Sequence, residues 1–513
     1  MKHLTALLLV VLLCLCLPGC QNSGSDDAWN EAVGATPQPS EAPEASEASL
    51  EEEDTTRKLV ITEPLYYGDD DIVWLANEFM AKNKDVEITF EYEMDVNESM
   101  SLSQEEYDQR HENYLSQLKT KLMTGEAPDI IRGVSGLNLY AMSQSGVFQD
   151  LSEYWAGDMD PEDFFMPVLE AMQVDGKQSI VPYGFYSYVA YVNRRVTDGL
   201  GIDLAGRNSI SAAEMIDWYN QAREQGLLDQ DAPMFFGQEP DYQTTLYSYE
   251  RGAFIDPTQR EAHFDAPEVS AFLADLQALP QVDDFTYFSY APYAPLTDEL
   301  IRTRLTGEET KVQNYDDMGA DGKFLDYVQQ GKEGLFSIDN LSETTARTAA
   351  DNPCEYVAGP YIVTDSKGQA QIIPYEEVAV SSSCKDPELA WEFIKYCISA
   401  RDSLDMGGGN RYLGYNVLSI NKTNCRLQLE KVKDTWGGQP GYANLSWFWA
   451  QDTDPQDIQS ALDGLLDRPL INRAMYSVPG AADILDEFLN RQLTDAKECA
   501  AKLQDQAYVW LNE

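Results

Sequence analysis

The chain has 513 residues, and its 87 acidic and 36 basic side chains give a formal net charge of −51. This charge excludes nucleic-acid binding, which depends on clustered Lys and Arg, and adhesion to an anionic bilayer by charge alone. Of its three histidines only His111 and His263 lie beyond the N-terminal segment, so the sequence offers no HExxH motif and no histidine-based triad. We expect no metal, no cofactor and no catalytic residue.

Residues 4–17 are nearly all apolar and follow a weak basic start at Lys2. A helix that crosses a bilayer takes about 20 residues, so this shorter stretch predicts a signal peptide over residues 1–19. Gly19 before Cys20 resembles the bacterial lipobox, in which the cysteine becomes the lipidated first residue of the mature protein. Acyl chains such as palmitate contribute about 0.8 kcal/mol per buried CH₂ and would anchor a water-soluble body. The alternative is ordinary secretory cleavage, with Cys20 an incidental thiol.

Residues 20–56 are rich in Ser, Ala, Glu, Pro and Gly, and hold ten acidic residues before the first basic one, Arg57. Such a stretch lacks the apolar side chains that offset ordering entropy, and predicts a disordered tether with a reach of roughly 30–35 Å. Anchor and tether together predict an extracellular protein on the cell membrane. Roughly 455 residues follow, more than one core usually absorbs, so we expect two or more lobes.

The first folded segment, residues 57–94, predicts a strand, a helix and a second strand. Apolar residues recur at helical spacing behind an Asp-rich start, and then alternate strictly as in a strand. The helical set is Ile72, Leu75, Ala76 and Phe79, and the alternating set is Val86, Ile88, Phe90, Tyr92 and Met94. This pattern indicates a βαβ unit.

Later segments repeat the pattern. Residues 114–125 predict a helix that ends at Gly125, and Ile130 with Ile131 predicts a short buried strand. Asp386 is an expected N-cap, and it precedes a helix with a buried stripe at Leu389, Ala390, Phe393, Ile394 and Cys397. Two helical patterns end the chain, over residues 481–493 and 495–511. Strands that alternate with helices predict an α/β fold with mainly parallel sheets.

The remaining cysteines predict no disulfide framework, because five of them follow Cys20 and their number is odd. They are Cys354, Cys384, Cys397, Cys425 and Cys499.

Eight segments stand in this order along residues 59–513: LANEFMAKNKDVEITFE, YLSQLKTKLMTGEAPDII, GVFQDLSEYW, SIVPYGFYSYVAYVNRRV, HFDAPEVSAFLADLQAL, GKEGLFSIDN, AVSSSCKDPELAWEFIKYCIS and LTDAKECAAKLQDQAYVWLNE. Together they resemble the signature blocks of bacterial extracellular solute-binding proteins of family 1, the sugar-type receptors of ABC importers. The resemblance implies a two-lobed periplasmic-binding-protein-like fold of type II, with a hinged cleft that closes on its ligand. It divides the chain into one lobe of residues 57–184 plus 356–405 and another of residues 185–355 plus 406–513.

In open parallel sheets the ligand lies beyond the carboxyl ends of the strands. Aromatic rings there would cover the apolar face of a sugar, while amides, carboxylates and Arg would pair with its hydroxyls. The predicted ligand-binding residues are Tyr66, Tyr67, Ser135, Asn138, Phe185, Tyr186, Tyr188, Asp339, Asn340, Asn410, Arg411 and Tyr412. The resemblance places family contacts near Tyr186 and Asn340. Any one of these aromatic residues could instead fill a core, and Asp339 could cap a helix.

The resemblance implies a monomeric receptor that captures a carbohydrate by lobe closure and hands it to the permease subunits of an ABC transporter. The length of the chain favours an oligosaccharide. Three alternatives stay open: an anchored glycoside hydrolase that uses two carboxyl groups, a ligand sensor that feeds a histidine kinase, and a receptor for a peptide, a polyamine or another solute.

Overall fold

The computed structural model describes residues 56–66, 71–133, 136–228, 230, 232, 234–235, 242–257, 259–280, 334–341, 357–401, 417–428, 462–493 and 495–512. These residues belong to one compact unit that spans Thr55–Glu513. The predicted signal peptide, Cys20 and the tether lie outside them. None of the helices among these residues is long and apolar enough to cross a membrane.

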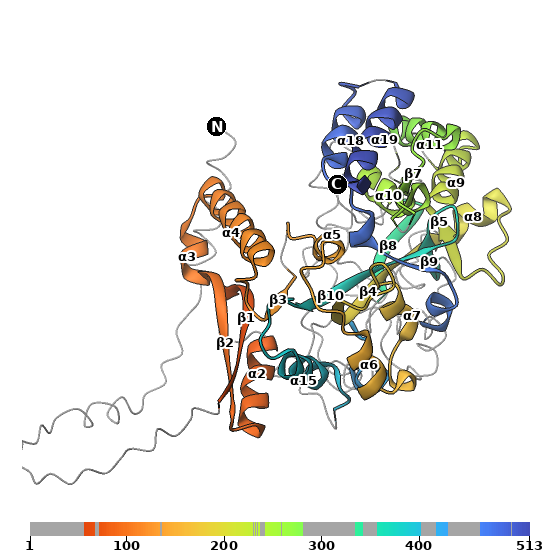
Figure 1. The fold of residues 1–513 in the computed structure, drawn as a ribbon. Helices are drawn as coiled ribbons and strands as arrows, with labels where there is room; N and C mark the ends of the chain where they lie inside the picture. The colour runs from red at the N-terminus through yellow and green to blue at the C-terminus, as the bar shows by residue number, and fades with distance from the viewer. Residues whose placement is uncertain are drawn as a thin grey trace, which may run out of the picture. The chain divides into compact units, whose positions relative to one another are not determined.

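The predicted βαβ unit is present at the start of the described chain (Figure 1). Strand β1 (Arg57–Tyr66) pairs in parallel with β2 (Val86–Asp95), and helix α2 (Asp71–Lys82) connects them. The predicted apolar face of α2 is buried, since Ile72, Leu75, Ala76 and Phe79 are at most 5% exposed. The helical periodicity is therefore confirmed, while along β2 the predicted alternation holds at Val86, Ile88 and Met94, which are buried, and Phe90 and Tyr92 are only partly buried.

Helix α4 (Gln104–Thr124) begins and ends on defined caps. The Ser103 hydroxyl accepts from the Glu106 N–H while the Glu106 carboxylate accepts from the Ser103 N–H, and Gly125 ends the helix at a φ of 74°. A left-handed residue at this point favours glycine because no Cβ is present to clash. The predicted short strand follows as β3 (Ile130–Arg132), which pairs in parallel with β1.

Two long strands connect the rest of the sheet. β4 (Ile180–Asn193) and β10 (Ala370–Val380) pair antiparallel, with Tyr186 opposite Ile373 and Ile180 opposite Ala379. β10 also pairs antiparallel with β3, so the ten-stranded sheet is mixed and not mainly parallel. Parallel pairing is kept where a helix connects neighbouring strands, as between β1 and β2.

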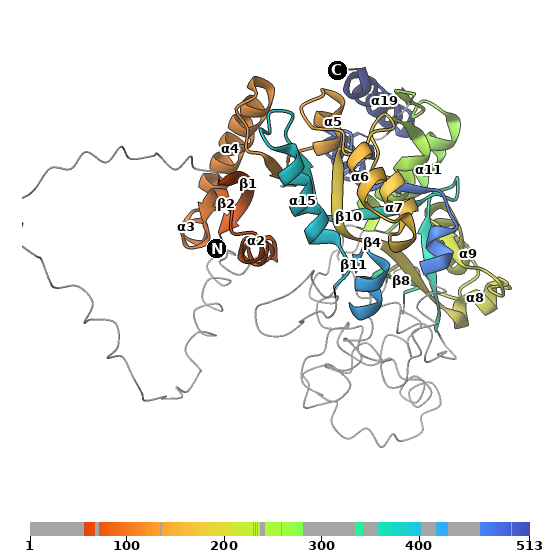
Figure 2. The same ribbon diagram turned by 60° about the horizontal axis from the view of Figure 1, so that its bottom comes forward.

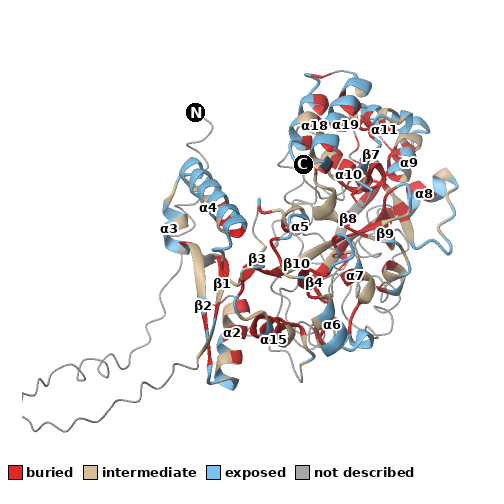
Figure 3. Cartoon of the chain, in the orientation of Figure 1, coloured by how far each residue is buried: buried red, intermediate tan, exposed pale blue. Residues whose placement is uncertain are grey.

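The buried apolar side chains form two clusters, and β4 contributes to both. The first cluster contains Ile180, Phe185 and Val189, and the second contains Ala190 and Val192. The buried residues of β4 are visible in Figure 3, as are those at the two ends of β10, whose middle residues 373–377 are only partly buried. The first cluster also includes residues from late in the chain, Leu418, Ile420, Cys425, Leu462 and Leu465.

Helix α15 (Pro387–Ile398) is capped and buried as predicted. The Asp386 carboxylate accepts from the Leu389 N–H at 3.0 Å and pairs with Arg57 at 2.8 Å. The predicted stripe from Leu389 to Cys397 is fully buried. Free thiols are found at Cys384, Cys397, Cys425 and Cys499 among the described residues.

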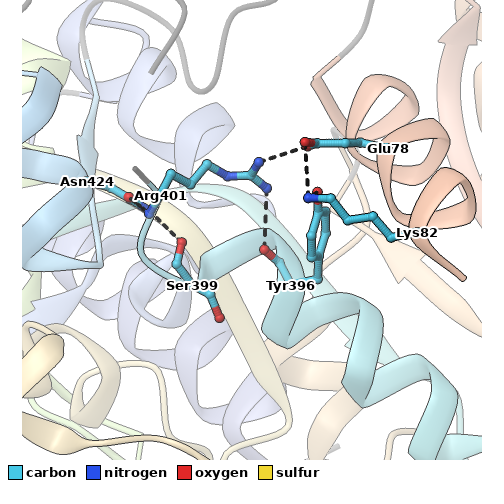
Figure 4. Close-up of polar contacts among 6 residues, drawn as sticks. All are labelled: Glu78, Lys82, Tyr396, Ser399, Arg401 and Asn424. Carbon is cyan, nitrogen blue, oxygen red and sulfur yellow. Dashed lines mark hydrogen bonds and ion pairs between the residues drawn. The ribbon is translucent and has the colours of Figure 1, made fainter. Parts of the chain in front are cut away.

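A polar cluster connects α15 to α2 (Figure 4). Arg401, just beyond α15, pairs with Glu78 of α2 at 2.9 Å, and its guanidinium lies 4.9 Å from the ring centre of Tyr396. Lys82 donates to Glu78 at 3.2 Å and to the Tyr396 hydroxyl at 2.8 Å. The Arg401 N–H donates to Asn424 at 2.9 Å. These contacts hold together helices more than 300 residues apart.

The remaining helices cover the sheet, and α18 and α19 pack against α11 (Figures 1 and 2). They are α3 (Val96–Ser101), α5 (Leu139–Gln144), α6 (Ser152–Asp158), η1 (Pro161–Asp163), α7 (Met166–Glu170), α8 (Arg194–Leu200), α9 (Ala212–Glu224), α10 (Tyr242–Glu250), η2 (Arg251–Phe254), α11 (Pro267–Ala278), η7 (Arg473–Tyr476), α18 (Ala481–Leu489) and α19 (Ala496–Asn512). The remaining strands are β5 (Ser209–Ser211), β6 (Ile255–Asp256), β7 (Glu261–Ala262), β8 (Phe336–Leu341), β9 (Val357–Thr364), β11 (Leu418–Ser419) and β12 (Leu470–Asn472).

Candidate functional site

The centre of β4 places two tyrosines side by side. Side chains alternate along a strand, and here Phe185 and Ser187 are fully buried while Tyr186 and Tyr188 are only partly buried. The two tyrosine rings meet edge to face, with centres 6.2 Å apart and an angle of 90° between their planes. Burial raises the pKa of Tyr186, so its hydroxyl is a neutral hydrogen-bonding group at physiological pH.

Tyr188 is held between two residues from distant parts of the chain. Its ring centre lies 4.9 Å from that of Tyr249, at the end of α10, and 5.5 Å from the guanidinium carbon of Arg473. Arg473 also donates a hydrogen bond to the Tyr188 hydroxyl. Arg473 reaches this position because it directly follows β12, which pairs in parallel with β10.

Arg251 adds a second guanidinium beside Arg473. It donates to the Arg473 carbonyl at 3.1 Å and to the Ser477 hydroxyl at 2.8 Å, while its Nε is buried without a hydrogen-bond acceptor. Burial, and after it the positive charge of Arg473, lower the pKa of Arg251 to about 10, so the Arg251 guanidinium stays charged at neutral pH. We call Tyr186, Tyr188, Tyr249, Arg251 and Arg473 the tyrosine–arginine cluster.

A partly buried carboxyl group, that of Glu377, lies on β10, in the strand next to this cluster. The Tyr140 hydroxyl donates a hydrogen bond to the Glu377 carboxylate and also lies 3.0 Å from the sulfur of Met172. The side-chain amide of Asn472 lies 3.0 Å from the same sulfur. Burial raises the pKa of Glu377 to about 7. Asn472 immediately precedes Arg473, so these contacts fix the backbone from which the Arg473 side chain extends.

The residue before Glu377 belongs to an ion-pair network. Arg132 of β3 pairs with Glu63 of β1 and with Glu376, and the three side chains are between 3% and 12% exposed. Glu376 has a φ of 52°, in the left-handed region that a non-glycine residue rarely adopts. The ion pair with Arg132 holds the Glu376 carboxylate in place. This attraction offsets part of the energetic cost of the left-handed backbone.

The structure brings together only some of the residues predicted from the sequence. Tyr186 and Tyr188 lie in the cluster, and the backbone of Asn340 on β8 pairs with that of Tyr188. Asp339 pairs with Val189 in the same ladder, and the side chains of both β8 residues lie outside the described part. The positions outside it altogether are Tyr67, Ser135, Asn410, Arg411 and Tyr412, and only the backbone of Tyr66 is described, at the end of β1.

Two of the predicted residues have structural roles. Phe185 is fully buried and meets Phe165 edge to face with ring centres 5.7 Å apart, so the predicted ligand contact is corrected to a core position. The alternation along β4 turns this ring away from its two tyrosine neighbours. The Asn138 side-chain oxygen accepts from the N–H groups of Tyr140 and Ala141, both at 3.1 Å, and thus caps α5.

Sequence reasoning missed Tyr249, Arg251 and Arg473. Their local sequences, YSYER and NRAMY, place arginines beside tyrosines in a strongly acidic chain. This pairing of arginine with tyrosine is a signal that the sequence offers for the site, but it does not indicate that the two segments lie close together in the fold. Among the described residues, no group of three His, Cys, Asp or Glu side chains could hold a metal ion.

Several solved structures are similar to this chain. A periplasmic oligogalacturonide-binding protein from Yersinia enterocolitica is 15% identical, with 89% of this chain and 99% of that chain covered and a TM-score of 0.51. A structure described as a de novo designed esterase is 14% identical, with 88% and 98% covered and a TM-score of 0.50. An ABC substrate-binding protein from Listeria monocytogenes, in complex with cycloalternan, is 13% identical, with 89% and 99% covered and a TM-score of 0.45. No curated protein matches the chain.

The family model "Bacterial extracellular solute-binding protein" matches residues 74–415, more than half of the 513-residue chain, so the chain belongs to that family. The resemblance in the eight segments is thereby confirmed, as is the α/β fold of the two-lobed binding proteins.

Proposed function

We propose that this protein is a membrane-anchored extracellular receptor that captures a carbohydrate, in particular an oligosaccharide, and delivers it to the permease of an ABC transporter. It acts as a monomer and performs no catalysis. The observation that carries the proposal is the pair of partly buried tyrosines on β4, Tyr186 and Tyr188, beside the arginine of η7. Aromatic faces cover the C–H side of a sugar ring, and an adjacent hydroxyl and guanidinium pair with its hydroxyls.

The position of this pair also supports the proposal. Tyr186 and Tyr188 lie where β4 passes from the first apolar cluster to the second, which is where a ligand captured by lobe closure would be enclosed. We propose lobes of residues 57–184 plus 356–405 and residues 185–355 plus 406–513, although Leu418, Ile420 and Leu465 of the second lobe belong to the first apolar cluster. The similar protein from Yersinia enterocolitica binds an oligogalacturonide, which supports a carbohydrate ligand here.

The test is a thermal-shift screen of the full-length protein in detergent against neutral and acidic oligosaccharides, peptides and polyamines. A ligand that binds only the native state at a hundredfold excess over Kd stabilises it by about 2.7 kcal/mol, which raises the melting temperature by several degrees. Tyr186→Ala should abolish the shift. Tyr508→Ala should not, because that tyrosine is 64% exposed on α19.

Other outcomes would replace parts of the proposal. A response to peptides or polyamines alone would keep the receptor and change its ligand. Cleaved oligosaccharide that disappears on mutation of a carboxylate would support the anchored hydrolase instead. Uptake that persists after deletion of the gene, with loss of a ligand-dependent kinase response, would support the sensor.

The anchor requires its own test. We propose that Cys20 is lipidated after removal of residues 1–19, and that residues 20–56 tether the folded body to the membrane. Metabolic labelling with palmitate should mark the wild-type protein and not Cys20→Ser, which should appear in the medium. Unlabelled wild-type protein released into the medium would favour ordinary secretory cleavage.

A further inference from the structure

The tyrosine–arginine cluster contains two positive charges and no negative one. Among the described residues, neither Arg251 nor Arg473 forms an ion pair, although the chain has 87 acidic side chains. The carboxylate nearest in sequence, Glu250, is used elsewhere, since it accepts from the Ser366 N–H at 3.1 Å. Burial also raises the pKa of Glu250 to about 7, so its negative charge is only partial near neutral pH.

Two other arginines with restricted exposure have carboxylate partners, whereas Arg223 and Arg468 have none among the described residues. Arg132 lies between two carboxylates, and Arg401 pairs with Glu78. Two neighbouring guanidiniums repel each other, and the buried Nε of Arg251 has lost hydration without gaining a hydrogen-bond acceptor. A structural role would be served better by one arginine with a carboxylate partner. An anion bound at this point would supply the missing charge.

The geometry of the donors indicates which anion fits. Arg473 uses one N–H group for the Tyr188 hydroxyl, and its planar guanidinium keeps further donors in a fixed fork. Such a fork matches the two oxygens of a carboxylate. The Tyr186 and Tyr188 rings next to it suit the C–H face of the sugar that carries the carboxylate.

We propose that Arg251 and Arg473, together with Tyr186 and Tyr188, form a subsite for the carboxylate of an acidic oligosaccharide, that is, one built from uronic acid residues. This inference rests on the proposed function, because it specifies the charge of the carbohydrate that the receptor captures. Arg473 contacts the carboxylate directly. Arg251 positions Arg473 through its hydrogen bond to the Arg473 carbonyl and adds its charge to the subsite.

The experiment compares matched ligands by isothermal titration calorimetry on the full-length protein in detergent. The probes are trigalacturonate and triglucuronate, their methyl esters, which lack the charge but keep the sugar, and the neutral trisaccharides maltotriose and cellotriose. The variants are Arg473→Gln, Arg473→Lys and the control Arg468→Gln. Arg468 is also partly buried and lies five positions upstream, where it donates to the Gly464 carbonyl and to Asn208.

We expect at least one acid to bind at least ten times more tightly than its methyl ester. This difference in affinity should decrease as NaCl is added. Arg473→Gln should abolish the difference in affinity between acid and ester, Arg473→Lys should retain part of it, and Arg468→Gln should leave it unchanged. The melting temperature of each unliganded variant checks that it has folded.

The contrary results separate the two proposals. If neutral trisaccharides or esters bind as tightly as the acids and Arg473→Gln has no effect, the acidic subsite is wrong and the carbohydrate receptor stands. If no saccharide of either charge binds, both proposals are wrong. If acids bind with the same preference in Arg473→Gln and Arg473→Lys, the carboxylate is recognised elsewhere and this subsite is wrong.

Discussion

Arg473 donates a hydrogen bond to the hydroxyl of Tyr188 and lies over its ring at 5.5 Å, although 285 residues separate the two in the chain. The same arginine forms no ion pair with a carboxylate among the described residues. Its side chain is therefore held in place by the ring and the hydroxyl group of Tyr188, neither of which provides a carboxylate to balance its charge. This arrangement provides both a surface for a sugar ring and a charged donor for its substituents.

Removing only the Tyr188 hydroxyl should weaken ligand binding moderately. Tyr188→Phe keeps the ring and loses the acceptor that orients Arg473, a hydrogen bond worth about 0.5–1.5 kcal/mol. We expect the Kd of the ligand found in the screen to rise by roughly fivefold, with a much larger loss for Tyr188→Ala, as measured by calorimetry. Equal affinities in Tyr188→Phe and wild type would contradict the orienting role of this hydroxyl.

The neighbours Phe185 and Tyr186 should separate stability from binding. Phe185→Ala removes a fully buried ring and should lower the free energy of unfolding by about 3–5 kcal/mol. Tyr186→Ala removes a partly buried ring and should cost less stability while it abolishes binding. Urea unfolding with calorimetry on each folded variant checks both effects. A larger loss of stability in Tyr186→Ala than in Phe185→Ala would overturn the assignment of the two faces of β4.

Arg132 should be essential to the fold through its two carboxylate partners. Arg132→Leu leaves Glu63 and Glu376 as adjacent buried charges, and we expect a loss of about 3–5 kcal/mol in the free energy of unfolding. Arg207→Leu is the matched control, because its ion pair with Glu214 is 34% and 39% exposed and should contribute about 0–1 kcal/mol. Similar urea midpoints for the two variants would rule out a special contribution from the buried network.

The carboxyl group of Glu377 should make stability depend on pH. Burial raises its pKa from an ordinary value of 4.5 to about 7, so the folded protein holds this proton more tightly than the unfolded chain does. Its contribution is fully present below about pH 4.5 and is lost as the pH rises through about 7. Glu377→Gln resembles the protonated form, and should therefore gain roughly 1–2 kcal/mol relative to wild type between pH 5 and pH 8.

The measurement for Glu377 is the difference between variant and wild-type urea midpoints across that pH range. The difference cancels the contribution of Glu250, whose pKa burial also raises to about 7. Glu487→Gln provides a control, because this carboxylate is half exposed beside Lys502. A difference between Glu377→Gln and wild type that stays constant with pH would show that Glu377 is charged in the folded protein throughout.

The amino-acid sequence by itself determined the local structure and the family. The spacing in α2, the alternation in β2, the Asp386 cap and the left-handed Gly125 each depend on residues within one or two turns of each other. Local backbone geometry and the burial of one face impose these patterns, so they can be read without a partner segment. The eight ordered segments indicate the family for a similar reason, because each is a contiguous stretch of sequence that can be recognised without knowing the fold.

The tertiary structure alone decided which side chains form the candidate site. Tyr186 was predicted and lies there, but Phe185 differs from it only in which face of β4 it occupies, and a strand largely buried on both faces has no polar alternation to reveal this. Arg473 reaches Tyr188 through the pairing of β4, β10 and β12, and Arg251 joins it through its hydrogen bond to the Arg473 carbonyl. Contacts across more than 200 residues of sequence depend on how whole strands pair, which no local pattern specifies.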